Sequence, residues 1–132
     1  MHFERLTSAD DPRFSAAMEG YAGSFPPHEQ REPASQRAIM TDPAYRFNLI
    51  YDGGAPVGAM LCWETETFIY VEHFFILPHL RGHACGSRAL ALLAPIYSLL
   101  PPRLAVETGF ATYHPVEDIA EISRKNSICV FV

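Results

Sequence analysis

The first part of the sequence has two hydrophobic periods in succession. Residues His2–Leu6 alternate as a short strand does, and capping residues then lead into Pro12, which is typical of a helix start. Pro26 and Pro27 end that helix, a polar loop follows over His28–Pro33, and a short helix is expected over Ala34–Met40. The apolar residues that define the first helix are Phe14, Ala17, Met18, Tyr21 and Phe25.

From Tyr45 the hydrophobic period is two. The pattern predicts strands over Tyr45–Tyr51 and Pro56–Glu64, joined by a hairpin turn at Asp52-Gly53-Gly54. A third strand is expected over Phe68–Leu77. Both its odd-numbered and its even-numbered positions are largely apolar, which is typical of a central strand covered by helices on each face. If this strand is regular, one face carries Tyr70, Glu72, Phe74 and Ile76, and the other carries Val71, His73, Phe75 and Leu77.

The rest of the chain alternates helix and strand less clearly. A helix is predicted over Gly86–Ala94, a strand over Arg103–Glu107 and a helix over Asp118–Asn126; the tail Ser127–Val132 fits a terminal strand or a short helix. The resulting order, β-α-α-β-β-β-α-β, predicts one α/β (α+β) domain over residues 1–132. Its sheet should be mixed and mostly antiparallel, turning parallel around one crossover helix, with helices on both faces.

Composition narrows the class of protein. The 132 residues are 48% apolar and 19% charged, which is typical of a globular domain with its own core. The net charge of −5 leaves no basic surface for a nucleic acid, and no apolar run is long enough to span a membrane. The start of the chain lacks a secretory h-region, and three widely spaced cysteines favour free thiols, so we expect a cytoplasmic protein.

The segment Tyr70–Leu93 carries the candidate chemistry. A buried strand is followed by a proline turn, Arg81, a loop of small residues and a helix. Helix N-termini bind anions through unpaired N–H groups, and an arginine can add a bidentate contact. An ordinary strand–loop–helix connection is the alternative. A Walker loop is disfavoured because no Gly-Lys-Ser/Thr follows the glycines.

Arg81-Gly82-His83-Ala84-Cys85-Gly86, after Ile76-Leu77-Pro78, resembles the acyl-CoA signature of the GNAT N-acetyltransferases. That signature is Arg or Gln, two variable residues, Gly, one variable residue, then Gly or Ala. The close resemblance covers Tyr70–Ala94, and the order of elements extends it over Met1–Glu107. One position departs from the pattern, since Ala84 stands where the family has its first glycine.

The resemblance implies acetyl-CoA as the acyl-donor substrate. The fourth and fifth strands should splay apart, with the pantetheine arm beside the backbone of Phe74, Phe75 and Ile76. Arg88 either reaches the 3′-phosphate or is a solvated surface residue. The pyrophosphate should bind to the loop and helix start, which are Arg81, Gly82, His83, Ala84, Cys85, Gly86 and Ser87.

Two other kinds of chemistry in this loop are disfavoured. His79, His83 and Cys85 lack the second ligand pair of a zinc site, so no metal is expected. A covalent intermediate on Cys85 is also disfavoured, because the family's acyl transfer is direct.

Transfer to a primary amine requires removal of a proton, since alkylamines are mostly protonated at neutral pH. Glu72 lies where related enzymes often carry an acidic residue facing the acceptor, so it is the candidate base or amine-positioning group. The alternative is a carboxylate paired with an arginine or with backbone N–H groups. His73 is expected to be a buried, hydrogen-bonded core residue, because it shares a face with Glu72 only if the strand contains a bulge.

The acceptor itself is constrained only weakly. Glu29 and Glu32, with Glu64 and Glu66 elsewhere, favour a cationic small molecule or peptide amine, or simply form a solvated acidic surface. Relatives often protonate the departing thiolate with a tyrosine. Here Tyr113 follows Glu107 but precedes the candidate helix, so that role is not assigned to it.

Two functions of different kinds remain open: an acetyl-CoA-dependent N-acetyltransferase, and a non-catalytic acyl-CoA-binding or interaction module derived from one. A nucleotide-phosphate binder of another kind lacks any lysine or carboxylate–magnesium motif near the loop. The apolar tail Ser127–Val132 predicts a homodimer with the tail at the contact, the alternative being a monomer with a frayed end.

Overall fold

A single mixed sheet runs through the protein. The structure, a computed structural model, describes residues 1–64, 69–93, 104–107 and 111–114, with backbone alone at 69–70, 104–107 and 111–114. The strand order in the sheet is β1-β2-β3-β4-β5-β6, and every neighbouring pair is antiparallel except β4 and β5, which are parallel. The strands are β1 (His2–Leu6), β2 (Tyr45–Asp52), β3 (Ala55–Glu64), β4 (Ile69–Ile76), β5 (Leu104–Glu107) and β6 (Ala111–His114).

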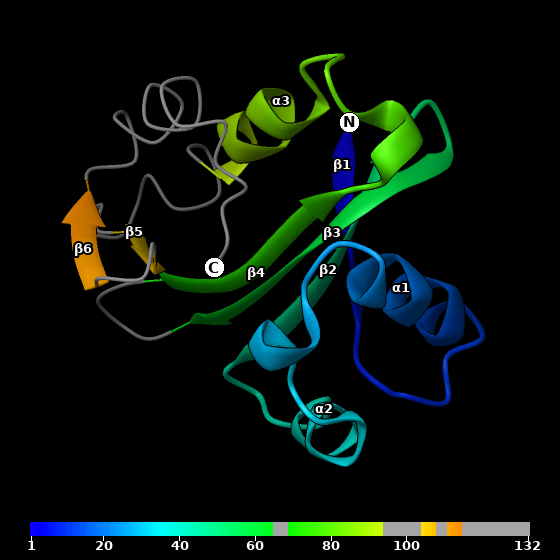
Figure 1. Ribbon diagram of the computed structural model, residues 1–132, viewed down its shortest axis with the longest axis vertical. Helices are drawn as coiled ribbons and strands as arrows, with labels where there is room; N and C mark the ends of the chain where they lie inside the picture. Colours follow the sequence, from blue (N-terminus) through cyan, green and yellow to red (C-terminus); the bar gives the residue numbers. More distant parts are fainter. Residues whose placement is uncertain (65–68, 94–103, 108–110, 115–132) are drawn as a thin grey trace.

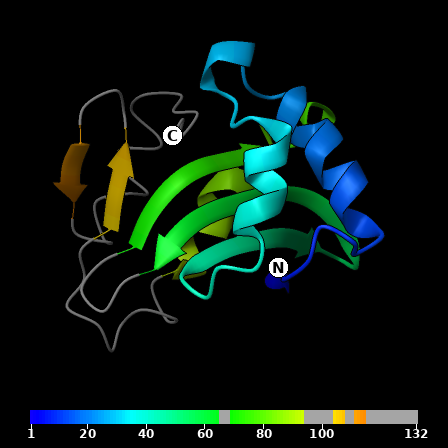
Figure 2. The ribbon, with the colours of Figure 1, turned by 90° about the horizontal axis from the view of Figure 1, so that it is seen from below.

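Helices cover both faces of this sheet (Figure 1). Helices α1 (Arg13–Ala22) and α2 (Pro33–Ile39) lie on one face, joined by a segment that includes the 3₁₀ turn η1 (Pro27–Glu29). Helix α3 (Cys85–Ala91) lies on the other face and follows β4 through the 3₁₀ turn η2 (Pro78–Leu80). Seen from below, the strands curve between the two helical layers (Figure 2). Within the described ranges, no helix is both long and apolar enough to cross a bilayer.

The predicted fold class and order of elements are confirmed. Helix α1 is shorter than expected: it ends at Ala22, and Phe25 lies beyond it. The chain turns back at Gly23, where the N–H groups of Ser24 and Phe25 both donate to the Tyr21 carbonyl. This turn buries Phe25 without any helical continuation.

Strand β6 is absent from the sequence prediction. Its four residues, Ala111–His114, are too short a run for their alternation to indicate a strand, and their backbone pairing with β5 defines it. Helix α3 was expected to reach Ala94, which lies outside the described residues. The candidate helix Asp118–Asn126, the tail Ser127–Val132 and the homodimer based on that tail also lie outside them.

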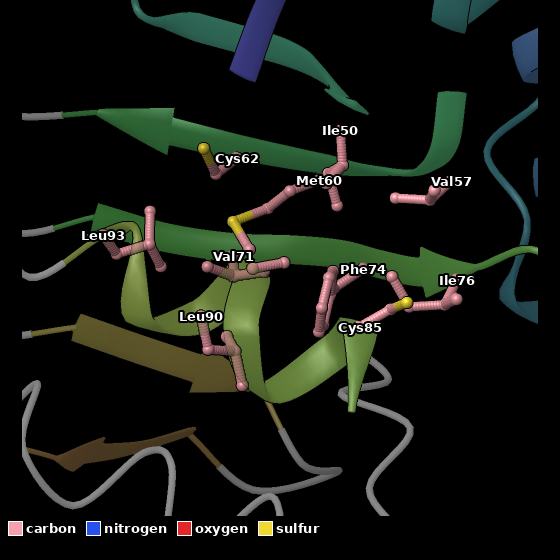
Figure 3. Close-up of a cluster of buried hydrophobic side chains, with 11 residues drawn as sticks. Ile50, Val57, Met60, Cys62, Val71, Phe74, Ile76, Cys85, Leu90 and Leu93 are labelled. Carbon is pink, nitrogen blue, oxygen red and sulfur yellow. The ribbon is translucent and has the colours of Figure 1, made fainter. Parts of the chain in front are cut away.

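Apolar side chains of β4 pack into two separate cores, one on each face of the sheet. The cluster under α3 is built around Val71, Phe74 and Ile76 of β4, with Cys85 and Leu90 of α3 packed onto them (Figure 3). The cluster under α1 and α2 contains Phe75 from β4, and the buried aromatic residues on that side are Phe14, Tyr21, Phe25, Tyr45 and Phe47. Strand β4 therefore carries the core of both layers, as its sequence indicates.

A β-bulge in β4 changes the expected facing of its residues. His73 pairs with Leu61, but the next β3 residue, Cys62, pairs with Val71, so Glu72 is one residue too many on β4. Val71 and Phe74 consequently share the α3 side, whereas Glu72 and His73 both contact residues of the α1–α2 side. The expectation that Glu72 and His73 point to opposite faces is therefore wrong.

Gly58 fixes the approach of β3 to β4. A Cβ on Gly58 would lie 2.1 Å from the Phe75 carbonyl oxygen and 3.0 Å from the Ile76 Cα. Both atoms are backbone, so relief would require the strands to separate. A side chain at position 58 would therefore disrupt the pairing of β3 with the second half of β4.

We expect Gly58→Ala to destabilise the protein by about 2 kcal/mol or more, in the upper range of overpacked core substitutions. Urea unfolding followed by circular dichroism measures the change. The control is Gly23→Ala, where the new Cβ would lie 3.4 Å from the Glu19 carbonyl oxygen at an ordinary backbone conformation, and where little change is expected. Equal stability of the two variants would contradict the close approach at Gly58.

Candidate active site

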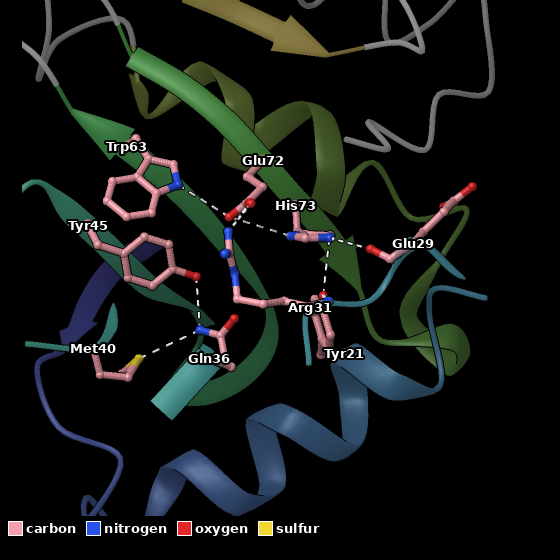
Figure 4. Close-up of polar contacts among 9 residues, drawn as sticks. All are labelled: Tyr21, Glu29, Arg31, Gln36, Met40, Tyr45, Trp63, Glu72 and His73. Carbon is pink, nitrogen blue, oxygen red and sulfur yellow. Dashed lines mark hydrogen bonds and ion pairs between the residues drawn. The ribbon is translucent and has the colours of Figure 1, made fainter. Parts of the chain in front are cut away.

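The bulge brings a buried polar cluster together on the α1–α2 side of β4 (Figure 4). The carboxylate of Glu72 accepts a hydrogen bond from Arg31 Nη2 through Oε1 and forms an ion pair with it. Its second oxygen, Oε2, lies 3.4 Å from Trp63 Nε1 on β3. The Glu72 side chain is 19% exposed and that of Arg31 is 21% exposed, so the pair is only partly open to solvent.

Arg31 belongs to the segment that joins α1 and α2, residues 23–32, called here the α1–α2 segment. Its backbone N–H donates to the Tyr21 hydroxyl at 2.7 Å. Burial by itself lowers the pKa of Arg31, but the hydrogen bond and charge of Glu72 outweigh burial and raise it. The segment is thus joined to the bulge by a hydrogen-bonded ion pair between Arg31 and Glu72.

His73 is buried, as the sequence predicts, with an exposed fraction of 5%. Its Nε2 lies 3.0 Å from the Glu29 carbonyl oxygen and 3.1 Å from the Tyr21 hydroxyl. The rings of Tyr21 and Phe25 pack edge-on against the imidazole. Its other nitrogen, Nδ1, is buried, has no hydrogen-bond partner among the residues that the structure describes, and lies 3.9 Å from Glu72 Oε2.

Residues of α2 and β2 complete the cluster. Gln36 is fully buried and donates from Nε2 to the Tyr45 hydroxyl at 3.0 Å, and the Tyr45 ring packs on Trp63. Burial raises the pKa of Tyr45, so its hydroxyl keeps its proton at neutral pH. The sequence analysis did not single out Arg31, Trp63 or Tyr45, because their contacts with Glu72 or Gln36 depend on chain folding and not on spacing.

One edge of β4 is open beyond the bulge. Parallel pairing with β5 involves only Ile69–Val71 among the described residues, which agrees with the predicted splaying of these strands. The N–H of Leu77 donates to the Val57 carbonyl, and the Phe75 carbonyl lies against Gly58, so both groups point toward β3. Because peptide groups alternate along a strand, those of Phe74 and Ile76 point toward the open edge. Of the three residues expected beside the pantetheine arm, Phe74 and Ile76 have main-chain groups that point there, although the Ile76 carbonyl already accepts a hydrogen bond from Arg81, and Phe75 has none.

The loop after β4 has the geometry of the predicted anion site. Residues Arg81–Ala84 are exposed, and nothing lies within 4 Å of the side-chain position of Gly82. Helix α3 begins at Cys85, one residue earlier than predicted, and the first N–H groups of a helix have no intrahelical acceptor. Gly86 and Ser87, in this first turn, are partly exposed. Exposed backbone donors next to Arg81 suit a pyrophosphate.

The side chain of Arg81 is engaged within the protein. Its Nε donates to the Ile76 carbonyl oxygen at 2.9 Å, and Nη2 donates to Ser24 Oγ at 3.1 Å. Arg81 therefore connects the open edge of β4 to the α1–α2 segment. These two bonds use two of the five guanidinium N–H groups, so a bidentate phosphate contact through Nη1 and Nη2, of the kind predicted from the sequence, does not require either bond to be exchanged.

The remaining predicted residues of this region have structural partners. Arg88 lies at the surface and donates to Asp52 at 2.7 and 2.9 Å. This hydrogen bonding holds the pKa of Asp52 below its ordinary value. His83 Nδ1 donates to the Arg81 carbonyl, and Cys85 is buried under α3. In the parts of the chain that are described, no three His, Cys, Asp or Glu side chains gather as a metal site would require.

The predicted acidic and tyrosine candidates lie in different surroundings. Glu29 and Glu32 are exposed on the α1–α2 segment, whereas Glu64 pairs with Arg46 at 2.7 Å. Glu66 and the side chain of Tyr113 lie outside what the structure describes. Of the predicted acidic residues that the structure describes, Glu72 lies at the bulge, and Glu29 and Glu32 lie on the α1–α2 segment.

Comparison with known proteins agrees with this arrangement. The family model of the Acetyltransferase (GNAT) family matches residues 10–97. A protein of Bacteroides thetaiotaomicron assigned to the GNAT family is 30% identical, with a TM-score of 0.71, over 95% of this chain and 68% of its own. No curated protein sequence matches.

Two more distant structures share the fold. An aminoglycoside acetyltransferase from an uncultured soil metagenomic sample, solved with sisomicin, is 14% identical, with a TM-score of 0.63, over 96% of this chain and 87% of its own. Tetrahymena GCN5 is 14% identical, with a TM-score of 0.57, over 95% of this chain and 78% of its own. The chain belongs to the GNAT acetyltransferase family, since the family model covers well over half of it, and it is an enzyme of the acetyltransferase class.

Ala84 adopts a backbone conformation suited to glycine. Its φ of 58° and ψ of 11° are left-handed, at the position where the family signature has its first glycine. We expect Ala84→Gly to stabilise the fold by about 0.5–1 kcal/mol, because the strain of a Cβ in this region exceeds the entropy that glycine loses on folding. CoA affinity should be equal or higher.

Thermal unfolding and titration calorimetry measure the two effects. The matched control is Ala91→Gly, the same chemical change at an exposed residue of α3, which should destabilise by about 0.5–1 kcal/mol. A loss of stability at both positions would mean that Ala84 is not strained, and a loss of CoA affinity would mean that the signature is out of register.

Proposed function

We propose that this enzyme transfers an acetyl group from acetyl-CoA to a primary amine, which attacks the thioester directly. The observation that supports it best is the layout of β4. Glu72 lies at the bulge, and two residues further on the open edge begins, which leads to the exposed loop at Arg81–Ala84. One strand thus carries an acidic group for the acceptor and the backbone groups for the donor.

The donor side is supported by backbone chemistry. The amide groups of a pantetheine arm can bond to the main-chain groups of Phe74 and Ile76 as an added strand would. The pyrophosphate would lie against the first turn of α3 and the loop before it. Arg81, which bonds to the Ile76 carbonyl and to Ser24 of the α1–α2 segment, supplies a cation beside that path.

The acceptor side favours a cationic amine. Glu72 can hold an ammonium through Oε2 and accept its proton, since Arg31 is bonded to Oε1. Glu29 and Glu32 add negative charge on the segment that borders this oxygen. Because such segments vary freely among proteins of one fold, the identity of the amine is not encoded in the shared framework.

A second candidate is a non-catalytic acyl-CoA-binding module. The pairing of Glu72 with Arg31 and the strained Ala84 favour it, because both differ from an accessible base and an ideal phosphate loop. Incubation with acetyl-CoA and a panel of amines separates the two candidates when released CoA thiol is followed. The panel includes an alkylamine, a polyamine, a peptide N-terminus and an aminoglycoside. Thermal protection by CoA without turnover of any amine would favour the module.

We also place the enzyme in the cytoplasm. Cys62 and Cys85 are free and buried, with no disulfide among the described residues, as is usual in a reducing compartment. Burial raises the pKa of Cys62 to about 12, so this thiol stays protonated and unreactive.

We expect Arg81→Glu to weaken CoA binding at least tenfold. The substitution removes a charge-assisted contact of about 1.5–3 kcal/mol and adds repulsion of the phosphates. Titration calorimetry measures the affinity. Arg88→Ala is the control, because Arg88 pairs with Asp52, and its affinity should stay within twofold of the wild type. Unchanged affinity in Arg81→Glu would place the pyrophosphate elsewhere.

We expect Glu72→Gln to lower kcat by about 10²–10⁴, the usual contribution of a general base, with CoA affinity near that of the wild type. The amide keeps the size of the side chain but cannot take the proton. The control is Glu4→Gln, which removes a carboxylate paired with Arg13 on the distant edge strand β1 and should not change kcat. If Glu72→Gln unfolds or loses CoA affinity while turnover per folded molecule persists, Glu72 has only a structural role.

A further inference from the structure

We propose that His73 acts through Glu72 as the residue that holds the acceptor's proton during acetyl transfer. The proposal rests on the proposed function, because it assigns the next step for the proton that Glu72 receives. The bulge makes it geometrically feasible by placing both side chains on one side of β4. His73 is therefore a positioning residue, which keeps Glu72 in its charged form and does not touch the acceptor.

The hydrogen bonds around Nε2 determine which nitrogen of His73 carries a proton. The Glu29 carbonyl, 3.0 Å from Nε2, can only accept a hydrogen bond, so Nε2 must be the donor. The Tyr21 oxygen, 3.1 Å from Nε2, already accepts the N–H of Arg31 at 2.7 Å and can accept this second donor with its other lone pair. With the proton on Nε2, a neutral imidazole has a bare lone pair at Nδ1.

That lone pair lies on the side of Glu72, where it can take a proton from the carboxyl group. Nδ1 is buried, has no hydrogen-bond partner in the described part of the chain, and lies 3.9 Å from Glu72 Oε2. A buried acceptor beside a carboxylate is poorly solvated and mildly repelled. A proton on Nδ1 replaces this with an ion pair between imidazolium and carboxylate, and Nε2 keeps its bonds.

Among the described residues, the other charged and titratable groups around His73 are engaged elsewhere, so Glu72 is the partner for Nδ1. Tyr21 approaches from α1, and its hydroxyl lies at Nε2. From the α1–α2 segment, the cation of Arg31 is bonded to Glu72, and the exposed carboxylate of Glu29 lies 3.7 Å from His28. From β2, the hydroxyl of Tyr45 is bonded to Gln36.

Arg31 explains why the proton should not stay on Glu72. Its Nε is buried without a partner, so its charge is compensated chiefly by the Glu72 carboxylate. A protonated Glu72 would leave this guanidinium without a counter-charge in a partly buried site, which is costly. Passing the proton to His73 restores the carboxylate.

The step is balanced without a further reactant. An N–H bond of the acceptor ammonium breaks, and an O–H bond forms at Glu72 Oε2, which leaves a neutral amine for attack on the thioester. The Glu72 carboxyl then turns to bring Oε2 about 1 Å closer to His73 Nδ1 than the 3.9 Å in the structure; the O–H bond breaks, and an N–H bond forms at Nδ1, which gives the imidazolium. After acetyl transfer, the proton returns through Glu72 to solvent, and the departing thiolate takes the second proton of the amine nitrogen.

Nitrogen NMR of the ¹⁵N-histidine-labelled protein tests the proton positions independently of turnover. We expect the neutral His73 ring to carry its proton on Nε2 and to gain the second one on Nδ1 as the pH falls. In Glu72→Gln the ring should titrate at lower pH, because the neighbouring negative charge is gone. A neutral ring with its proton on Nδ1, or a titration unchanged in Glu72→Gln, would overturn the proposal.

Kinetics test the role in transfer, with His73→Gln retaining a donor near the Glu29 carbonyl. We expect kcat to fall about tenfold to a hundredfold, KM for the amine to stay within threefold, and the limb of the kcat–pH profile that follows the His73 titration to disappear. Tyr21→Phe disturbs the same contacts without removing the imidazole, and it should retain that limb. His2→Gln, an exposed histidine on β1, should change nothing.

Failure of the proposed function and failure of the relay through His73 give different experimental results. If the wild type acetylates no amine, the proposed function fails, while NMR still reports where the proton resides. If the wild type is active and His73→Gln keeps the full pH profile, the relay through His73 is wrong and the acetyltransferase assignment stands. If His73→Gln does not fold, the NMR titrations of the wild type and Glu72→Gln decide.

Discussion

The extra residue in β4 is the constraint on which the functional half of the structure depends. A regular strand would point Glu72 toward α3 and His73 toward α1, and neither could meet the other. The bulge turns both toward the α1–α2 segment and returns Phe74 to the opposite core. Arg31, Tyr21 and the Glu29 carbonyl then have partners on the strand. The tight pairing at Gly58 fixes the strand just beyond this irregularity.

Much of this framework could be predicted from the sequence, because it depends on local periodicity. The double parity of β4, the turn at Gly53 and the helix after Arg81 all depend on neighbouring residues, and the structure contains each of them. The bulge could not be predicted, since an additional residue in an apolar strand leaves the composition unchanged. Arg31 was missed for a different reason: it lies 41 positions from Glu72, and one arginine in a polar loop carries no signal of its partner.

The same limitation applies to the phosphate loop. The six-residue pattern around Ala84 predicts a glycine position, and the left-handed backbone at that residue agrees with it. The destination of the Arg81 side chain was not predictable, because its two acceptors, the Ile76 carbonyl and the Ser24 hydroxyl, belong to different elements. Local patterns thus suffice to predict the loop after β4, whereas the surroundings of Glu72 depend on contacts between distant segments.

The proposed function puts both substrate sites on β4, which would separate reaction geometry from substrate choice. The distance between the acidic group at the bulge and the open edge is set by two peptide units of one strand, and no loop can alter it. The α1–α2 segment contacts this strand chiefly through side chains, with Arg31 as the main ionic contact. Segments from other members of the family could therefore be grafted between α1 and α2 to change which amine is accepted. The engineering requirement is a cation that replaces Arg31 beside the bulge, rather than a redesigned reaction centre.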